Sequence, residues 1–502
     1  MRFLKAGKKF FCSLFLFAFV NAFIFAQELE PVHPSIEPAF FPEDVVSGDL
    51  DRSSSLSADD VFKFSLMFSE CQRGSEEERF CLEQFEKLKK KVSGDDYMTL
   101  EPAERGRAVL KLLYQDYLKT YDFGQTRIDV ALQTGVYNCV SSALLYMAVA
   151  KASGLDVRGQ KTSEHAFCTV YIPGSKAGQY QKIDVETTNP YGFNPGSRET
   201  IENEDKIQGY YIVPKKYYAN RQEVSDKVFA GLIAGNICAE YIGHDNYSKA
   251  VPLGAARYEL VRQEQSKAVT QVRRDFDILA SNYVNLEVES AQVFQGYVEW
   301  FTSFIDRWGM TDYLQKNMDN ALYNLMVYCF DEKNYELAAA AYEKNKGYLT
   351  KNQDAKVSDI LTDILVTSKF SEDQPAEEQI AAIEELLNEY TFEQAQQKRV
   401  LVYLENAWLS ILNVCMSERT YGTGYQKSCD ALERLPNSTK IKKMQKSFYD
   451  NCIAIIHNNF AKQANAGYLD DARKVLEAGM QVFPDDKTLK ADLATLNRMQ
   501  KN

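Results

Sequence analysis

Basic side chains are in deficit in this sequence. Its 502 residues hold 58 Lys and Arg against 70 Asp and Glu, which gives a formal net charge of −12 at pH 7. No basic patch along the chain offsets this deficit. Nucleic acids and anionic lipid surfaces select cationic proteins, so neither is expected as a partner.

Long apolar runs are also lacking, with one exception at the start of the chain. Residues 2–9 carry four basic side chains and no acidic one, residues 10–25 are almost wholly apolar, and Ala26 follows. This order predicts a secretory signal peptide over residues 1–26, with a retained anchor helix as the alternative. The mature chain would be secreted or periplasmic, carry about −16 charges and have no further transmembrane span.

Paired cysteines and metal-ligand clusters are not evident either. The predicted signal peptide holds one of the ten cysteines, and the remaining odd number leaves at least one thiol unpaired. Most of the others stand singly in helical segments, where buried free thiols are expected. Cys71 and Cys81 fall in consecutive predicted helices and could close a hairpin disulfide in an oxidising compartment.

Metal and cofactor sites are not expected. His165 and Cys168 are three residues apart in a predicted strand, a spacing that points them to opposite faces. A zinc ion there would also lack a fourth ligand. The neighbouring Glu164 and Glu186 are expected to be solvated.

Three blocks bring a thiol, an imidazole and a carboxylate into one short stretch: Cys139, His165 and Asp184. Asn138 is a favourable N-cap, an apolar run follows it, and this predicts a helix that begins at Cys139. Alternating residues around His165 and Asp184, joined by a Pro-Gly turn, predict two paired antiparallel strands.

The chemistry of these residue types is that of a cysteine nucleophile. In the first turn of a helix, unpaired N–H groups and the macrodipole lower the pKa of a thiol, and an imidazolium lowers it further. We therefore expect Cys139 to attack, His165 to act as general base, and Asp184 to fix the tautomer of His165.

The motifs Asn-Cys-x-Ser, Glu-His-Ala-Phe and Ile-Asp-Val-Glu-Thr-Thr resemble the transglutaminase-like superfamily over roughly residues 100–220. The resemblance implies a papain-type core, in which a Cys helix packs on an antiparallel sheet, and a Cys139-His165-Asp184 triad. Gln133, six residues before Cys139, would then supply an oxyanion-hole amide beside the Cys139 N–H, or else lie solvated in a loop. No Trp follows Cys139 and no calcium loop is evident, so amide hydrolysis is at least as strongly indicated as cross-linking.

From residue 228 onward the periodicity is helical to the end of the chain. The segments resemble degenerate tetratricopeptide repeats, with an irregular helical bundle as the alternative. Two copies fit the spacing of this repeat: one consists of Trp408, Ile411, Cys415, Tyr421, Gly424, Ala431 and Pro436, and the other of Gly467, Ala472, Leu476, Gly479 and Pro484. Stacked helix pairs form a surface that binds a peptide or a partner protein.

The sequence therefore predicts an α+β protein with five segments. These are a signal peptide (1–26), a disordered leader (27–56), a helical lead-in (57–100), a transglutaminase-like domain (101–227) and a helical repeat region (228–502). A last strand is expected within 209–218. The expected function is an exported cysteine hydrolase or acyltransferase that acts on protein or peptide amides. The alternative is a non-catalytic scaffold whose repeats carry the function.

Overall fold

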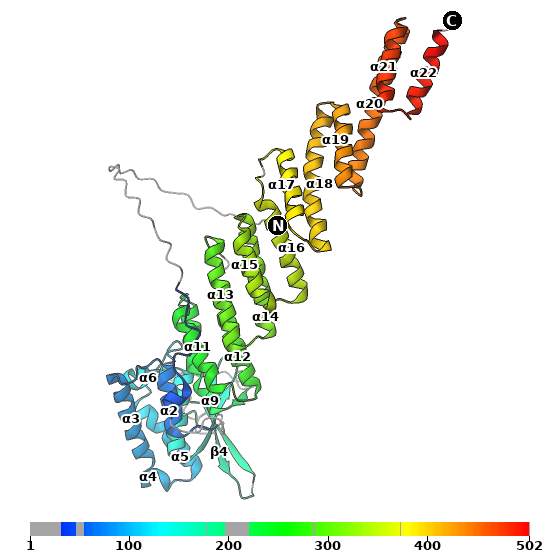
Figure 1. The fold of residues 1–502 in the computed structure, drawn as a ribbon. Coiled ribbons are helices and arrows are strands. Elements are labelled where there is room, and N and C mark those ends of the chain that lie inside the picture. The colour runs from blue at the N-terminus through cyan, green and yellow to red at the C-terminus, as the bar shows by residue number, and fades with distance from the viewer. Residues whose placement is uncertain are drawn as a thin grey trace, which may run out of the picture. The chain divides into compact units, whose positions relative to one another are not determined.

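The computed structural model describes residues 32–46, 55–176, 178–195, 220–284, 287–371 and 373–500. The expected signal peptide and the strand expected within 209–218 lie outside these residues. Residues from His33 onward form one compact unit. Figure 1 traces its elements in chain order.

Helices open the described chain. They are α1 (Pro42–Val45), α2 (Ala58–Phe68), α3 (Glu76–Val92), α4 (Asp95–Met98), α5 (Pro102–Asp116) and α6 (Ile128–Thr134). The hydroxyl of Ser57 accepts from the Asp60 N–H, and that of Ser75 accepts from the Glu78 N–H. These caps satisfy amides that the first helical turn leaves unpaired.

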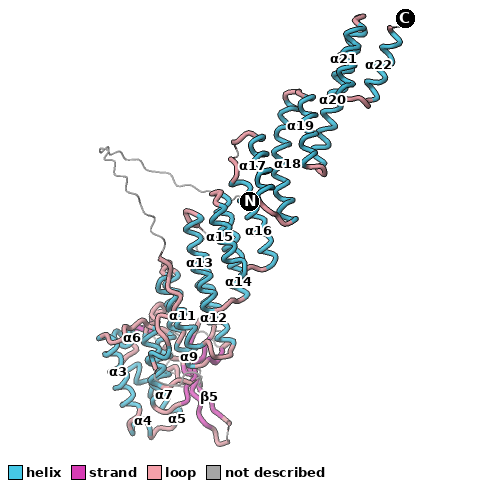
Figure 2. The backbone as a smooth tube through the Cα atoms, viewed as in Figure 1, coloured by secondary structure: helices cyan, strands magenta, loops and turns pink. Residues whose placement is uncertain are grey.

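The fold is of the α+β class, as the sequence predicted. Its main sheet is antiparallel in the order β5-β4-β3-β6. The strands are β3 (Asp156–Lys161), β4 (Ala166–Pro173), β5 (Tyr180–Val185) and β6 (Gln222–Val224). A short parallel pair, β1 (Thr120–Tyr121) and β2 (Val136–Tyr137), lies apart from it. Figure 2 shows the strands gathered among the helices of the N-terminal part.

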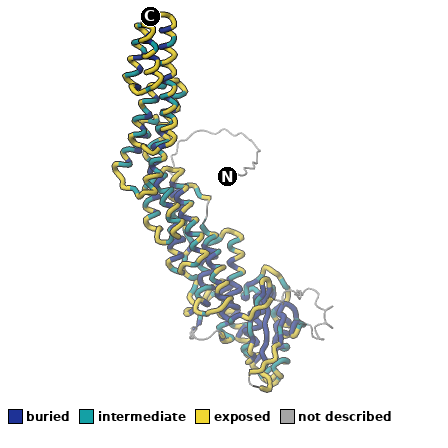
Figure 3. Tube along the Cα trace, turned by 90° about the vertical axis from the view of Figure 1, so that its right-hand side faces the viewer, coloured by how far each residue is buried: buried dark blue, intermediate teal, exposed yellow. Residues whose placement is uncertain are grey.

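Helix α7 (Cys139–Ala152) is the central element of this part. It packs on β3 and β4 and is also contacted by α2, α3, α5 and α6. Every residue from Cys139 to Ala150 is buried, which is the pattern of a helix surrounded by protein rather than one with a solvent face. Figure 3 shows this burial continuing through the strands.

The remaining described chain is helical. It comprises α9 (Asp226–Ala230), α10 (Leu232–Ile242), α11 (Tyr247–Val261), α12 (Lys267–Tyr283), α13 (Ala291–Trp308), α14 (Asp312–Asp331), α15 (Tyr335–Asn345), the 3₁₀ turn η3 (Lys346–Tyr348), α16 (Lys351–Ser368), α17 (Ala376–Glu389), α18 (Gln394–Ser417), α19 (Tyr421–Arg434), α20 (Thr439–Asn465), α21 (Leu469–Val482) and α22 (Lys487–Met499).

These later helices form successive packed pairs. Helices α14, α16, α18, α20 and α22 each contact the next member of this series, and the helices between them pack alongside. Gly424 in α19 is buried against the ring of Phe448 in α20, where an added Cβ would lie 2.3 Å from the ring. A small residue is therefore required at that crossing, as in the repeat pattern read from the sequence.

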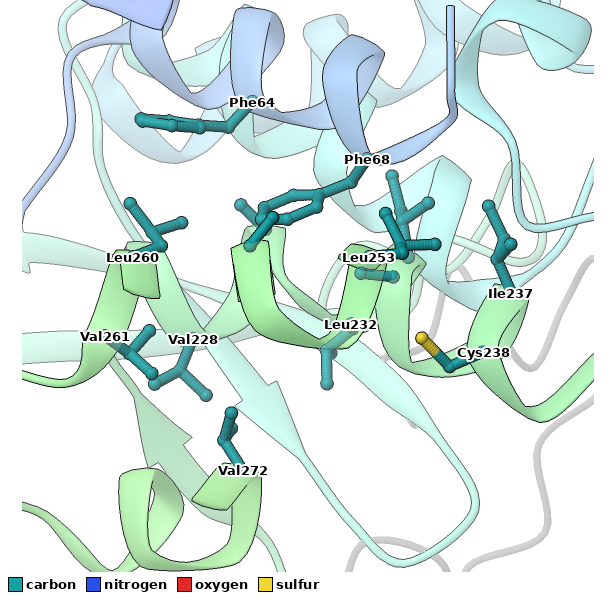
Figure 4. Packing of buried hydrophobic residues seen from close by; sticks show 14 of the residues in the cluster. Phe64, Phe68, Val228, Leu232, Ile237, Cys238, Leu253, Leu260, Val261 and Val272 are labelled. Atoms are coloured by element: carbon teal, nitrogen blue, oxygen red, sulfur yellow. The ribbon is translucent and has the colours of Figure 1, made fainter. Parts of the chain in front are cut away.

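The first later helices share the core of the N-terminal part. Figure 4 shows Phe64 and Phe68 of α2 facing helix α11, which carries both Leu253 and Leu260. Helix α9 also contacts β3. One hydrophobic core thus continues across residue 228, where the helical repeat region was expected to begin.

The leader is packed over the part that the structure describes, although a disordered segment was expected. The indole N–H groups of Trp300 and Trp308 donate to the Pro34 and Ile36 carbonyls at 2.7 and 2.9 Å. The Ala39 N–H donates to the Pro252 carbonyl at 2.8 Å. Backbone groups of an irregular segment thus find partners on α11 and α13, which fixes its path.

Two further expectations concern the Cys71–Cys81 disulfide and membrane-spanning helices. Cys71 and Cys81 are both buried free thiols, so the hairpin disulfide is not formed. Among the described residues, α18 is long and apolar enough to cross a membrane by length and composition. It also packs against α16, α17, α19 and α20, as a helix within a helical array does.

Candidate functional site

The site begins at the N-terminus of α7. The Asn138 side-chain oxygen accepts from the Val140 and Ser141 N–H groups at 2.9 and 3.1 Å, and the Ser141 hydroxyl accepts from the Asn138 N–H at 3.0 Å. This reciprocal capping box fixes Cys139 as the first residue of the helix. The Cys139 N–H has no hydrogen-bond partner among the described residues.

His165 lies beside Cys139, immediately before β4. Its N–H donates to the Thr162 hydroxyl at 2.9 Å, and its carbonyl accepts from the Thr162 N–H at 2.8 Å. This tight turn sets the position of the imidazole. The ring is hydrogen-bonded to the Cys139 side chain and, through Nε2, lies 2.7 Å from Glu186 Oε2.

The charged form of the imidazole is favoured here. Burial alone would lower the pKa of His165, but hydrogen bonds to Cys139 and Glu186 and the charges of both groups outweigh it. The pKa of His165 is raised to about 10. The His165 and Glu186 side chains are each only 3% exposed, so solvent screens their interaction little.

Glu186 is held at both of its carboxylate oxygens. While Oε2 faces His165, Oε1 accepts from the Thr188 N–H at 3.1 Å and from the Thr188 hydroxyl at 2.7 Å. The Tyr137 hydroxyl donates to the Thr188 carbonyl, and the Thr187 hydroxyl pairs with that of Ser142 on α7. The turn that carries Glu186 is thereby tied to β2 and α7, so the carboxylate cannot swing away from the imidazole.

Asp184 does not occupy the expected place behind His165, and Glu186 does. In the sheet Asp184 pairs with Thr169, four residues into β4 from His165. Its carboxylate accepts from the Thr169 hydroxyl at 2.8 Å and forms an ion pair with Arg221. The register of β4 and β5 therefore corrects the assignment by two residues. The expectation that Glu186 is solvated was wrong, whereas Glu164 is exposed as expected.

Gln133 also lies away from the thiol. It is exposed near the end of α6, and its side chain hydrogen-bonds to Cys81. It is not among the described residues that line the cavity at Cys139. Its assignment as an oxyanion-hole donor is thus corrected, because α6 directs that side chain toward α3. Cys168 donates to the Ala143 carbonyl of α7 at 3.3 Å, on the opposite strand face from His165 as the spacing predicted.

A pocket of about 720 Å³ opens onto the Cys139 and His165 side chains. One wall is formed by α10, from the region assigned to helical repeats, and another by the exposed ring of Phe123. The lining residues are Phe123, Gly124, Thr126, Asn138, Cys139, Val140, Lys161, Thr162, Ser163, Glu164, His165, Ala166, Leu232, Asn236, Ala239 and Glu240. No sequence motif indicated the α10 wall, because the polar residues of α10 follow an ordinary helical pattern.

Comparison with known proteins gives little direct guidance. No family model matches the chain, and no curated protein matches it. Among solved structures the chain is similar to menin, in a crystal structure described as revealing the binding site for the Mixed Lineage Leukemia (MLL) protein. That alignment covers 80% of each chain at 10% identity, with a TM-score of 0.27. A TM-score this low does not establish a shared fold or a shared function.

Proposed function

We propose that this chain is a transglutaminase-like cysteine hydrolase or acyltransferase that acts on amides of a protein or peptide. The observation that carries the proposal is the buried Cys139-His165-Glu186 constellation at the base of an open pocket. A thiol at a helix start, a hydrogen-bonded imidazole and a carboxylate that orients the imidazole are the parts that nucleophilic catalysis needs.

The first half of the reaction forms a thioester. His165 enters the reaction as an imidazolium beside the Cys139 sulfur, which attacks the carbonyl carbon of the amide as a thiolate. The oxyanion accepts a hydrogen bond from the Cys139 N–H, which has no partner in the described structure. His165 then gives its proton to the departing amine, the C–N bond breaks, and the acyl group remains on sulfur.

The second half of the reaction releases the acyl group. His165 removes a proton from the incoming nucleophile, which attacks the thioester carbonyl, and the C–S bond breaks. Water as nucleophile gives hydrolysis, and an amine gives transfer. The carboxylate of Glu186 stabilises the imidazolium form of His165.

The rest of the chain fits this proposal in an accessory role. The N-terminal sequence supports export through a cleaved signal peptide, and the later helix pairs offer a surface on which a partner or substrate protein can dock. The helix pairs alone would also suit a scaffold, a second candidate favoured by exposed apolar side chains on them. These include Val402, Val414, Ile455 and Val482.

Selective alkylation of Cys139 tests the enzyme against the scaffold. At pH 6 iodoacetamide should label Cys139 first, because the raised pKa of His165 keeps the imidazolium beside the sulfur. Burial raises the pKa of Cys71 to about 11 and those of Cys81, Cys238 and Cys329 to about 12, so their thiols stay protonated. The selectivity should therefore persist to pH 8, as peptide mass spectrometry of the labelled chain would record.

The pH profile adds a second readout. The labelling rate of Cys139 should change little between about pH 6 and 9, since His165 remains charged below its pKa of about 10. In His165→Ala the rate should be lower at pH 6 and rise with pH like that of an ordinary thiol. Equal labelling of Cys139 and the half-buried Cys429 at pH 6 in folded protein would favour the scaffold.

A further inference from the structure

A second cavity adjoins the pocket at Cys139. It has a volume of about 380 Å³ and lies between the end of β3 and helices α10, α11 and α12. Lys161, Ser163, Leu232, Asn236 and Ala239 line both cavities. The two therefore form one continuous recess, with the thiol at one end.

The charges of this recess are unequally distributed. Glu164 and Glu240 lie at the Cys139 end. Arg257 and Asp275 line only the second cavity and Lys161 lines both, so two cations face one carboxylate in the second cavity. This cationic end is unusual in a chain of net charge −12.

Each of the two cations has at least one N–H donor without an acceptor among the described residues. Arg257 is only 7% exposed and donates through Nη1 to Asp275 at 3.1 Å, but its Nε is buried without a hydrogen-bond partner. Lys161 is half-buried, and its ammonium has no hydrogen-bond or ion-pair partner among the described residues. Burial, together with the charge of Arg257, lowers the pKa of Lys161. Buried cations without partners are costly, and an anion in the cavity would remove that cost.

The backbone of α10 makes room for this arrangement. An added Cβ at Gly235 would lie 3.1 Å from the Cζ and Nη1 atoms of Arg257. Glycine at this point lets the guanidinium lie close against the helix and line the cavity. The planar guanidinium and the adjacent ammonium match the geometry of a carboxylate.

We propose that this cavity is a subsite for an acidic side chain of the substrate, whose carboxylate binds Lys161 and Arg257 while the scissile amide lies at Cys139. The inference rests on the proposed function and adds a substrate class to it: an acidic protein or peptide segment. The negative charge of Glu164 and Glu240 at the other end of the recess sets the direction in which the segment binds.

Matched active-site probes test the subsite. A set of N-acetyl tripeptide chloromethyl ketones carries Glu, or its neutral counterpart Gln, at one position at a time. The rate of alkylation of Cys139 in the full-length protein is measured by mass spectrometry. At one position the Glu probe should react about tenfold faster than the Gln probe. Lys161→Gln should abolish that ratio, whereas Lys182→Gln, which removes the same charge from β5 outside both cavities, should preserve it.

The outcomes separate the two proposals. If iodoacetamide labels Cys139 selectively but the Glu and Gln probes react at equal rates at every position, the subsite is wrong and the cysteine chemistry stands. If neither iodoacetamide nor any probe selects Cys139, both proposals fall. A Glu preference that survives Lys161→Gln undiminished would also overturn the subsite, because its ammonium would then play no part.

Discussion

At the scale of single residues, the carboxylate that serves His165 decides the chemistry of the site. Glu186 is buried, held by Thr188 and 2.7 Å from the imidazole, whereas Asp184 binds Thr169 and Arg221. Only the first of these carboxylates can stabilise an imidazolium directly. The two residues therefore differ in the effect that neutralising each should have.

Neutralising Glu186 should impair Cys139, and neutralising Asp184 should not. In Glu186→Gln the imidazolium loses its buried counter-charge, so labelling of Cys139 by iodoacetamide at pH 6 should slow by about tenfold or more. Asp184→Asn keeps an acceptor for the Thr169 hydroxyl and should change the rate by less than about twofold. Labelling time courses on both variants, with circular dichroism to show that each is folded, measure the contrast.

The reverse ranking would restore Asp184 as the orienting group and would remove Glu186 from the proposed mechanism. The sequence alone could not settle this ranking, because residues two apart on a strand share one face. Which of them meets His165 depends on the register of β4 and β5. That register is set across the turn joining Pro173 to Tyr180 and by the packing of Val185 rather than by any local motif.

At the scale of elements, the sequence predicted the structure correctly where a helix cap or a hydrophobic periodicity determines it. Asn138 caps α7 at the expected residue, and β4 and β5 fall where alternation around His165 and Asp184 placed strands. The α10 wall of the pocket could not be anticipated, because its contact with the Cys139 end of α7 joins segments about a hundred residues apart. The assignment of Gln133 as an oxyanion-hole donor was wrong for the same reason, since the direction of its side chain depends on how α6 packs against α3.

Two glycines of α19 offer a matched test of helix-pair packing. Gly424 is buried against Phe448, whereas Gly422 is exposed and an added Cβ there would meet nothing within 4 Å. Gly424→Ala should destabilise the pair by about 1–3 kcal/mol through overpacking. Gly422→Ala should be neutral or stabilise by up to about 1 kcal/mol, because alanine favours the helix.

Chemical denaturation of both variants, followed by the helical signal, measures this difference. Equal stability of the two would mean that α19 and α20 do not pack as described. The helix pairs would then need a different arrangement, and the repeat interpretation would lose its structural support.

At the scale of the whole molecule, one buried ion pair joins three parts of the chain. Asp226, at the start of α9, accepts from the Lys151 ammonium at 2.6 Å and from the Leu56 N–H at 2.8 Å. Lys151 belongs to the last turn of α7, and Leu56 precedes α2. Asp226 is 5% exposed, so the pair is shielded from solvent and ties the lead-in, the Cys helix and the later helices together.

Removal of this carboxylate should destabilise the whole unit. Asp226→Ala leaves the Lys151 ammonium buried without its counter-charge and the Leu56 N–H without its acceptor. The expected cost is about 3–5 kcal/mol in the free energy of unfolding. Asp471→Ala, which breaks the exposed pair with Lys474, is the control and should leave the free energy of unfolding almost unchanged. The double variant Lys151→Met with Asp226→Asn should cost less than Asp226→Ala alone, because no charge remains buried and the asparagine still accepts from Leu56.

Urea unfolding followed by tryptophan fluorescence measures the stability of all three variants. The indoles of Trp300 and Trp308 donate to the leader segment, so their emission changes when the unit unfolds. A cost for Asp226→Ala no larger than that for Asp471→Ala would show that the three parts are held together by apolar packing alone.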